Sequence, residues 1–209
     1  SPNSMIRQRS LGEIAQKRGD LDLAEKSFRK TISLGEFSVF KTPAAHIGLA
    51  KVCAEKNNTS EAIRVLGEVH KHFDDPEAAL HAKVIEGAVH SKSGNLVEAR
   101  KLAGEVAAMV KESAARLPAH ITLEAADLIM GTGNKDAAAD LLKIVVQNNH
   151  ENKQMIEDVK RVFVKGNMEE AGNDLVESSL QEVVQTNNKG VALAKEGKLD
   201  EAVTLMRNA

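Results

Sequence analysis

The residues of this chain that could carry out chemistry are one cysteine, seven histidines and scattered pairs of carboxylates. His70 and His72 stand two positions apart, so on a helix they point to different faces and do not form a metal site by themselves. Cys53 lies among aliphatic residues, which is typical of a buried, unreactive thiol. A single cysteine also excludes an internal disulfide and a cysteine-based zinc site.

The stretch Gly131-Thr132-Gly133-Asn134 has half the pattern of a phosphate-binding loop. No strand pattern precedes it and no third glycine follows, so we interpret it as a turn between helices. Carboxylate pairs such as Glu169-Glu170 stand at the expected starts of helices, where negative charge favours the helix dipole. We therefore predict no catalytic residue, no metal site and no cofactor, and we expect that this protein is not an enzyme.

Composition narrows the classes of partner. The chain has five Phe but no Tyr or Trp, which argues against stacking on bases or sugars. The 28 Lys and Arg residues against 30 Asp and Glu leave a net charge of −2, so no global basic field favours nucleic acid or an anionic membrane. No apolar run is long enough to span a bilayer, and no signal-peptide pattern is present. We expect a cytoplasmic protein with a protein or peptide partner, no nucleic acid and no membrane.

An internal repeat predicts the elements that would position any site. Six stretches begin with Gly or Asn and have an alanine five residues later, and these alanines follow one another at spacings of 31 to 39 residues. Gly or Asn can take the left-handed conformation that ends a helix, and the Asp or Asn that follows in five stretches can cap the next helix. Each stretch therefore predicts a tight turn between two helices. The alanines are Ala24, Ala62, Ala99, Ala138, Ala171 and Ala202.

Small and apolar residues recur around these alanines. An apolar residue follows each alanine by four positions, one helical turn further along the same face. A residue that is usually small precedes each alanine by twelve positions, which allows the two helices to cross closely. The preceding residues are Gly12, Ala50, Gly87, Ala126, Val159 and Gly190, and the following ones are Phe28, Leu66, Ala103, Leu142, Leu175 and Met206.

The repeat resembles the tetratricopeptide repeat (TPR), most closely where Leu11-Gly12 is followed by Ala24 and Phe28, and where residues 188–194 are followed by Glu201-Ala202. This resemblance implies an all-α fold, a right-handed α-solenoid of about six antiparallel helix pairs in a TPR-like superhelix. We interpret residues 1–4 as an expression scar and residues 5–209 as the solenoid. Its units cover approximately residues 5–42, 43–76, 77–117, 118–150, 151–182 and 183–209.

Three segments leave their local structure open. No Gly or Pro marks a turn between Glu177 and Asn187, so residues 174–196 form either two helices or one long helix. Residues 96–117 can run as one helix that Pro118 ends. In the connection at residues 35–43, we expect Phe37 and Phe40 to pack onto the solenoid, with an exposed contact site as the alternative.

The TPR resemblance also implies where a partner would bind. In that family the first helix of each pair lines a concave groove that holds a segment of a partner. An apolar stripe with nearby lysines would suit an amphipathic partner helix with acidic edges. Alternatively, a rotation of the first helices by one residue would place this stripe in the core. The groove residues predicted in this way are Arg9, Ile47, Lys51, Val84, Leu123, Asp127, Ile156, Lys160 and Asn187.

Two hypotheses about function follow. The first is a non-catalytic protein-interaction scaffold that binds a partner segment in the groove. The alternative is a regulatory or dimerisation module of a bacterial signalling protein, such as a TPR-containing response regulator. A homodimer is compatible with both hypotheses.

Overall fold

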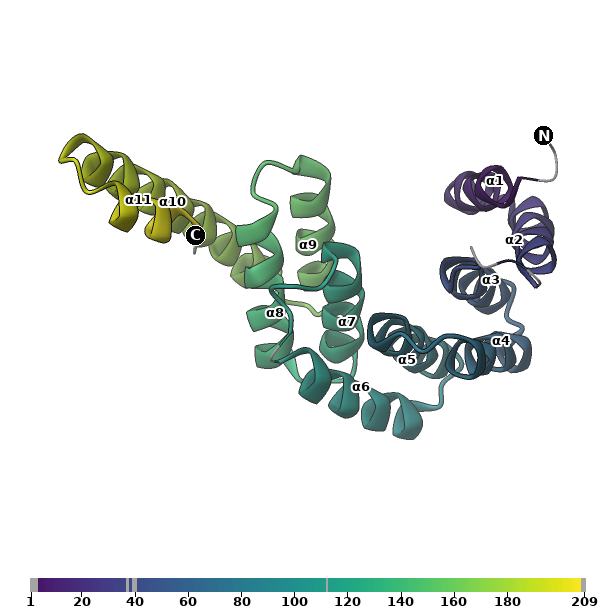
Figure 1. Cartoon of the computed structure of the whole chain (residues 1–209). Helices are drawn as coiled ribbons and strands as arrows, with labels where there is room; N and C mark the ends of the chain where they lie inside the picture. The colour runs from purple at the N-terminus through teal and green to yellow at the C-terminus, as the bar shows by residue number, and fades with distance from the viewer. Residues whose placement is uncertain (1–3, 37, 39–40, 112, 208–209) are drawn as a thin grey trace. The chain divides into compact units, whose positions relative to one another are not determined.

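A computed structural model describes residues 4–36, 38, 41–111 and 113–207. All regular structure in this part of the chain is α-helical, and eleven helices follow one another (Figure 1). The predicted all-α fold of repeated helical pairs is therefore confirmed. The helices are α1 (Met5–Lys17), α2 (Leu21–Gly35), α3 (Ala44–Glu55), α4 (Thr59–His72), α5 (Pro76–Lys92), α6 (Leu96–Val110), α7 (Ala119–Gly131), α8 (Lys135–Asn148), α9 (Lys153–Lys165), α10 (Glu169–Lys195) and α11 (Leu199–Arg207).

The chain divides into two compact units, residues 1–109 (unit 1) and 110–209 (unit 2). In unit 1, α1 packs on α2 and α3 on α4, and neighbouring pairs meet through contacts of α2 with α3 and of α4 with α5. In unit 2, α7 packs on α8, α9 contacts both of these helices, and α10 contacts α8, α9 and α11. Each unit is thus built by the stacking of successive helical pairs.

The turn inside each pair uses the chemistry that the repeat predicts. A left-handed residue ends each first helix, and it is Gly or Asn because these residues adopt a positive φ at low cost. The residue after it caps the second helix in several pairs; Asp20, for example, accepts a hydrogen bond from the backbone N–H of Leu23 at 3.1 Å. The left-handed residues are Gly19, Asn57, Gly94, Gly133, Asn167 and Gly197.

Close helix crossings form the core. Five of the six repeat alanines are buried, and Ala171 is the exception. In unit 1 the buried ring of Phe28 lies between Gly12 of α1 and Gly48 of α3. A Cβ added to Gly12 would lie 2.9 Å from the nearest ring atom of Phe28, and a Cβ added to Gly48 would lie 2.5 Å from it. Glycine is therefore required on both sides of this ring.

The register predicted for the fifth pair is wrong by one residue. Asn167, not Gly166, takes the left-handed conformation, with φ of 54°. Five residues later Gly172 is buried in the place that alanine occupies in the other pairs, whereas Ala171 is exposed. The physical reason is Phe163, whose side chain lies only 2.6 Å from the place where a Cβ of Gly172 would be. Only a glycine leaves room for that ring.

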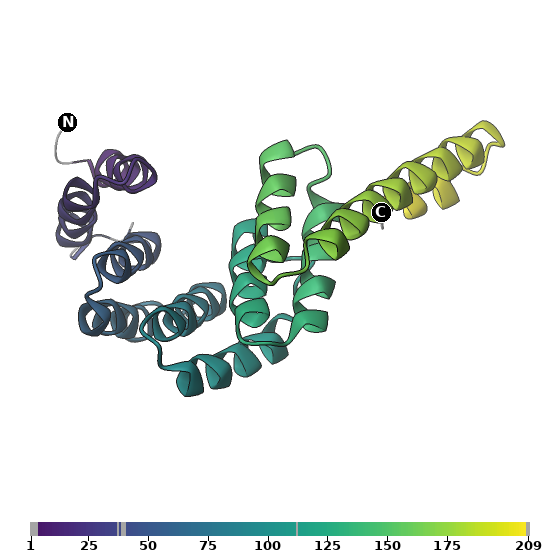
Figure 2. The same cartoon turned by 180° about the vertical axis from the view of Figure 1, so that it is seen from behind.

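The structure gives the extent of two helices whose ends the sequence left open. Helix α10 is continuous from Glu169 to Lys195, so the alternative of one long helix is what the structure has, and the predicted boundary between residues 182 and 183 lies inside it (Figure 2). Helix α6 ends at Val110, so the prediction of a helix that reaches residue 117 is wrong. The carbonyl of Val110 accepts hydrogen bonds from the N–H groups of Ser113 and Ala114, which close a turn. Phe37, Phe40 and residues 1–3 lie outside the described residues.

Candidate functional site

The apolar stripe predicted for the groove is mostly buried in the fold. Ile47, Val84 and Ile156 are 5%, 0% and 9% exposed, and only Leu123 is partly accessible. Three of the four side chains are therefore unable to contact a partner while the helices keep their packing. Burial corrects the groove prediction at these three positions and agrees with the alternative that places the stripe in the core.

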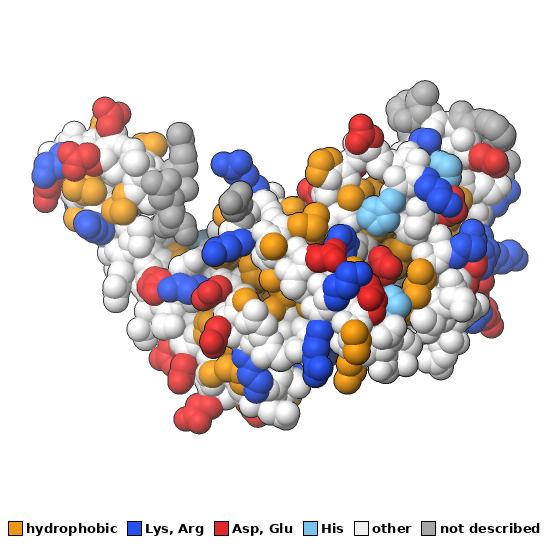
Figure 3. Space-filling model, turned by 90° about the horizontal axis from the view of Figure 1, so that it is seen from below, with side chains coloured by type: hydrophobic (Ala, Val, Ile, Leu, Met, Phe, Trp, Pro, Cys, Tyr) orange, Lys and Arg blue, Asp and Glu red, His pale blue; other side chains and the backbone are white. Residues whose placement is uncertain are grey.

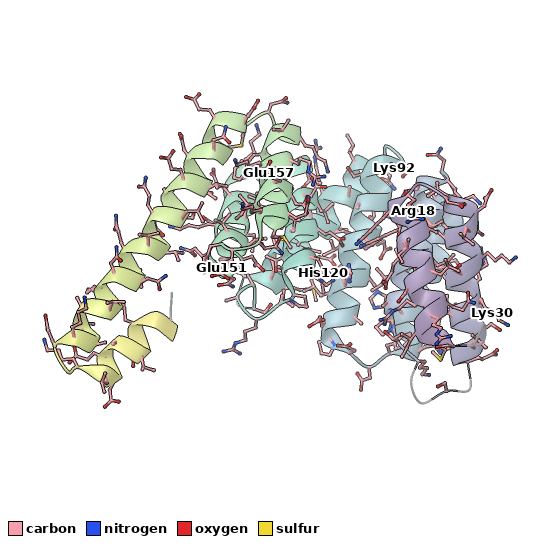
Figure 4. The ribbon with its side chains drawn as sticks, turned by 90° about the horizontal axis from the view of Figure 1, so that it is seen from above. Arg18, Lys30, Lys92, His120, Glu151 and Glu157 are labelled. Atoms are coloured by element: carbon pink, nitrogen blue, oxygen red, sulfur yellow. The ribbon has the colours of Figure 1, made fainter. Side chains whose placement is uncertain are left out.

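The polar residues predicted for the groove are half-buried or exposed, and three of them form ion pairs. Arg9 pairs with Glu13 of its own helix at 3.3 Å, and Asp127 of α7 pairs with Lys165 of α9 at 2.7 Å. Lys160 lies 3.7 Å from Glu157, whose side chain is labelled in Figure 4. Of the other two, Lys51 is half-buried and Asn187 is exposed on α10.

The shifted register of the fifth pair changes which residue matches the others. Counted from the left-handed residue, Arg9, Ile47 and Leu123 stand ten positions before the turn. In the fifth pair that position belongs to Glu157, which is exposed, and not to Ile156. An acidic residue therefore takes the place of the apolar one that the sequence pattern suggested.

A concave site is present elsewhere, in unit 1. A pocket of about 490 Å³ lies where the end of α2, the start of α3 and the end of α4 meet. These ends come together because the helices of stacked pairs run in opposite directions. The apolar part of its wall is formed by Met5, Ile32, Ala45, Leu49 and Val65. Charged and polar side chains complete the wall, among them Arg29, Glu36, Lys41, His46, Arg64, Glu68 and His72.

Phe73 and two side chains around it form one wall of this pocket. The ring of Phe73 meets the imidazole of His46 edge to face, with 5.4 Å between the ring centroids. The ammonium group of Lys41 lies 5.8 Å from the centroid of the same ring, within the range of a cation–π contact. Burial lowers the pKa of His46, and the neighbouring His72 acts in the same direction. His46 is therefore neutral at pH 7.

Glu68 of α4 supplies negative charge to the same pocket. Its carboxylate accepts hydrogen bonds from Lys71 at 3.3 Å and binds the His72 ring nitrogen at 2.9 Å. These two contacts hold the pKa of Glu68 below its ordinary value, so the group is ionised at neutral pH.

A network of charges continues from the pocket along α2 and α4. Arg29 of α2 binds Glu25 at 2.9 Å and Glu61 of α4 at 3.0 Å, and Arg64 binds Glu61 at 2.7 Å. The hydrogen bond from Arg64, together with that from Arg29, lowers the pKa of Glu61 to about 2 although partial burial opposes this shift. Lys56 at the end of α3 joins the network through Glu25 at 2.7 Å. The two arginines of the pocket are therefore held in place by fixed carboxylates.

The sequence motifs do not mark this pocket, although a simple count of positions points to it. His46 stands eleven residues before the turn residue Asn57, and Glu68 stands eleven residues after it. In an antiparallel pair, residues at equal distances from the turn lie near each other. No such count from the turn residue predicts that Phe73, which follows the end of α4, lines the pocket.

The described residues give little support to metal binding, to a reactive thiol or to a helix that crosses a membrane. No group of three or more His, Cys, Asp or Glu side chains in them is placed to hold a metal ion. Cys53 is buried, and burial raises the pKa of its thiol, which disfavours the reactive thiolate. Of the helices described, none combines the length and apolar character needed to cross a membrane.

Comparison with known proteins adds one structural likeness. No protein-family model matches the chain, and no curated protein matches it. Among solved structures, the chain is similar to the crystal structure of YrrB, a TPR protein with an unusual peptide-binding site. The two share 12% sequence identity, the match covers 86% of each chain, and the TM-score is 0.41. The assignment of a helical-pair repeat rests on the turns and the packing described above.

Proposed function

We propose that this protein is a non-catalytic protein-interaction scaffold and that the pocket of unit 1 receives an apolar side chain of a partner segment. The observation that carries this proposal is the pocket itself, which combines an apolar wall with a charged rim. Pockets of this size and character are the usual sites for a small apolar group with a few polar contacts.

The charges of the rim favour an acidic segment on either side of that apolar side chain. Among the lining residues Arg29, Lys41 and Arg64 are cationic, and Glu36 and Glu68 are carboxylates. Arg29 and Arg64 already pair with Glu25 and Glu61, so the attraction for an acidic partner rests on Lys41. Lys41 is exposed and lies over the face of Phe73, so its ammonium group can meet a partner carboxylate at the mouth. An amphipathic segment with acidic edges therefore fits this pocket, as the sequence hypothesis for the groove also required.

Groove binding remains part of the proposal in a reduced form. Leu123 is the apolar residue of the predicted stripe that stays partly accessible. Burial removes Ile47, Val84 and Ile156 from the set of contact residues. The groove residues that we still propose are Arg9, Lys51, Leu123, Asp127, Lys160 and Asn187.

Selection from a displayed library of random twelve-residue peptides tests the pocket directly. We expect enriched peptides to carry one large apolar residue flanked by Asp or Glu. Ser33 is exposed and lines the pocket, so Ser33→Trp blocks the mouth without entering the core. Ser60 is also exposed on a helix of unit 1 but does not line the pocket, so Ser60→Trp is the matched control.

Loss of peptide binding by at least tenfold in Ser33→Trp, with binding unchanged in Ser60→Trp, would support the pocket. Equal binding by both variants would reject it. If Leu123→Asp then weakens the binding of the same peptides, the groove is the binding site. A library that yields no binding peptide at all would count against both sites.

The hypothesis of a regulatory module in a bacterial signalling protein stays a prediction. A module of that kind would also act through a bound segment. Attaching this chain to a signalling domain and measuring output with and without the selected peptide separates regulation from scaffolding alone.

A further inference from the structure

A second pocket lies in unit 2, at the end of the pair α7–α8 that is opposite its turn. Its volume is about 360 Å³, and its wall is formed by the start of α7, the end of α8 and the turn that precedes α7. A water molecule has a share of about 30 Å³ in the liquid, so this space can hold a much larger group. Pockets of this size are typical of sites for a small ligand or a single side chain.

This pocket has the same place in its pair as the pocket of unit 1 has in the pair α3–α4. The shared positions lie eleven residues before the turn residue, eleven after it and fifteen after it. In unit 1 these positions are His46, Glu68 and His72. In unit 2 they are Thr122, Ile144 and Asn148.

The third pair, α5–α6, shows that the first two of these positions face each other. Lys83 stands eleven residues before the turn residue Gly94, Glu105 stands eleven after it, and an ion pair joins their side chains. The side chains at these positions therefore determine the chemistry at this end of a pair.

Thr122 has a hydroxyl group that the fold leaves without a hydrogen-bond partner. The residue is 1% exposed, and its Oγ1 atom has no partner among the described residues. A buried hydroxyl in this state costs stability, because it has lost its bonds to water without a replacement. Thr122 lines the pocket, so a group bound there can reach this hydroxyl.

The wall of the pocket is neutral in the part of the chain that the structure describes. Its other polar side chains are the amides of Asn148, which is exposed, and Asn149, whose Nδ2 donates to the carbonyl of Val145 at 2.9 Å. His120 and Glu151, labelled in Figure 4, stand at this end of the pair but do not line the pocket. Side chains of both charges are spread over the surface seen in Figure 3, whereas this pocket offers an ion no opposite charge.

Three kinds of bound group can be compared. A carboxylate or an ammonium group would lose water without gaining an opposite charge. A purely apolar group would leave the hydroxyl of Thr122 without a partner. A carboxamide has an acceptor oxygen and two N–H donors, so it can bind this hydroxyl and pair with an asparagine amide at the same time.

We propose that the pocket of unit 2 binds a neutral carboxamide, the side chain of Gln or Asn in a partner segment. The hydroxyl of Thr122 binds the carboxamide inside the pocket, and the amide of Asn148 binds it at the mouth. Ala114 and Ala119 of the wall have short side chains, which leaves room for the methylene groups of the bound side chain. The two pockets share no residue, so either one can fail a test while the other passes.

NMR titration of the isotope-labelled full chain with N-acetyl-glutamine N-methylamide tests the proposal. We expect saturable shifts in the signals of Thr122 and Asn148, with a Kd of about 1 to 10 mM for so small a ligand. The matched compounds are the glutamate analogue, which has the same shape but a negative charge, and the leucine analogue, which is apolar. All three compounds have the same backbone amides, so weaker binding of the matched compounds, by about fivefold or more, isolates the side-chain carboxamide.

Thr122→Val removes the hydroxyl and keeps the shape of the side chain. We expect it to weaken binding of the glutamine compound by about fivefold or more and to raise Tm, because an unpartnered buried hydroxyl is replaced by a methyl group. Thr122→Ser keeps the hydroxyl and should retain binding. Ser179→Ala is the matched control: Ser179 is also buried without a partner among the described residues but does not line the pocket, so binding should stay unchanged.

The proposal is overturned by equal binding of the three compounds, by the absence of a saturable shift, or by unchanged binding in Thr122→Val. A lower Tm of Thr122→Val would also overturn it, because the hydroxyl would then have a partner inside the chain. Shifts around His46 and not Thr122 would place the ligand in the pocket of unit 1, with the same consequence. If Thr122→Val does not fold, Ala115→Trp at an exposed residue of the wall blocks the pocket instead, and the same loss of binding is expected.

Discussion

Replacing Gly48 by alanine tests the packing that determines the spacing of the first two helical pairs. A Cβ at Gly48 would lie 2.5 Å from Cζ of Phe28 and 2.6 Å from its Cε1. Carbon atoms in contact normally stand about 3.5 to 4.0 Å apart, so the methyl group overlaps the ring by about 1 Å. The ring is buried and meets Gly12 on another helix, so it has no space into which to move.

The expected cost follows from this overlap. Overpacking of a dense core costs about 1 to 3 kcal/mol, and more where neighbours are fixed. Alanine returns up to about 1 kcal/mol because it favours the helix more than glycine does. We therefore expect Gly48→Ala to lower the free energy of unfolding by about 1 to 3 kcal/mol, which corresponds to about 5 to 20 °C in Tm for a unit of this size.

Gly67 is the matched control, since it is also a helical glycine of unit 1 but an added Cβ would meet nothing within 4 Å. Gly67→Ala should therefore raise stability by about 0.5 to 1 kcal/mol. Urea unfolding followed by circular dichroism measures both variants. Phe28→Leu shortens the ring and should reduce the penalty of Gly48→Ala in a double-mutant cycle. If Gly48→Ala is as stable as Gly67→Ala, the ring is not confined as described and the argument fails.

Four further outcomes are expected. Gly172→Ala should destabilise unit 2 by about 1 to 3 kcal/mol in urea unfolding, because its Cβ would overlap Phe163, whereas Ala171→Gly should cost only the helix propensity of about 1 kcal/mol. Glu61 has a lowered pKa of about 2 against an ordinary 4.5, so its contribution is present above pH 4.5 and is lost as the pH falls toward 2; Glu61→Gln should be less stable than wild type by about 1 to 2 kcal/mol at pH 7 and equal to it near pH 2. Ile47→Asp should lower the helical signal or Tm sharply, since it buries a carboxylate, and a folded variant with normal Tm would restore this residue to the groove. Cys53 should react with a thiol reagent only on unfolding, and rapid reaction of the native protein would contradict its burial.

The turns of the repeat could be predicted from sequence because their chemistry is local. Gly19 and Asn57 adopt the left-handed conformation because glycine has no Cβ and asparagine tolerates a positive φ. The sequence predicts the turn of the fifth pair at Gly166 because most of the other turns have Gly followed by Ala five residues later. Asn167 can also take a positive φ, and it is the residue that does so. The choice between them depends on Phe163 of α9, whose side chain packs against Gly172 of α10.

The candidate contact surfaces could not be predicted in the same way, because exposure depends on how each helix is rotated against its neighbours. Val84 and Val191 have the same side chain, and both lie on first helices of their pairs, yet the first is fully buried and the second is 45% exposed. The difference arises from what packs against each side chain, and a repeat pattern in the sequence does not contain that information.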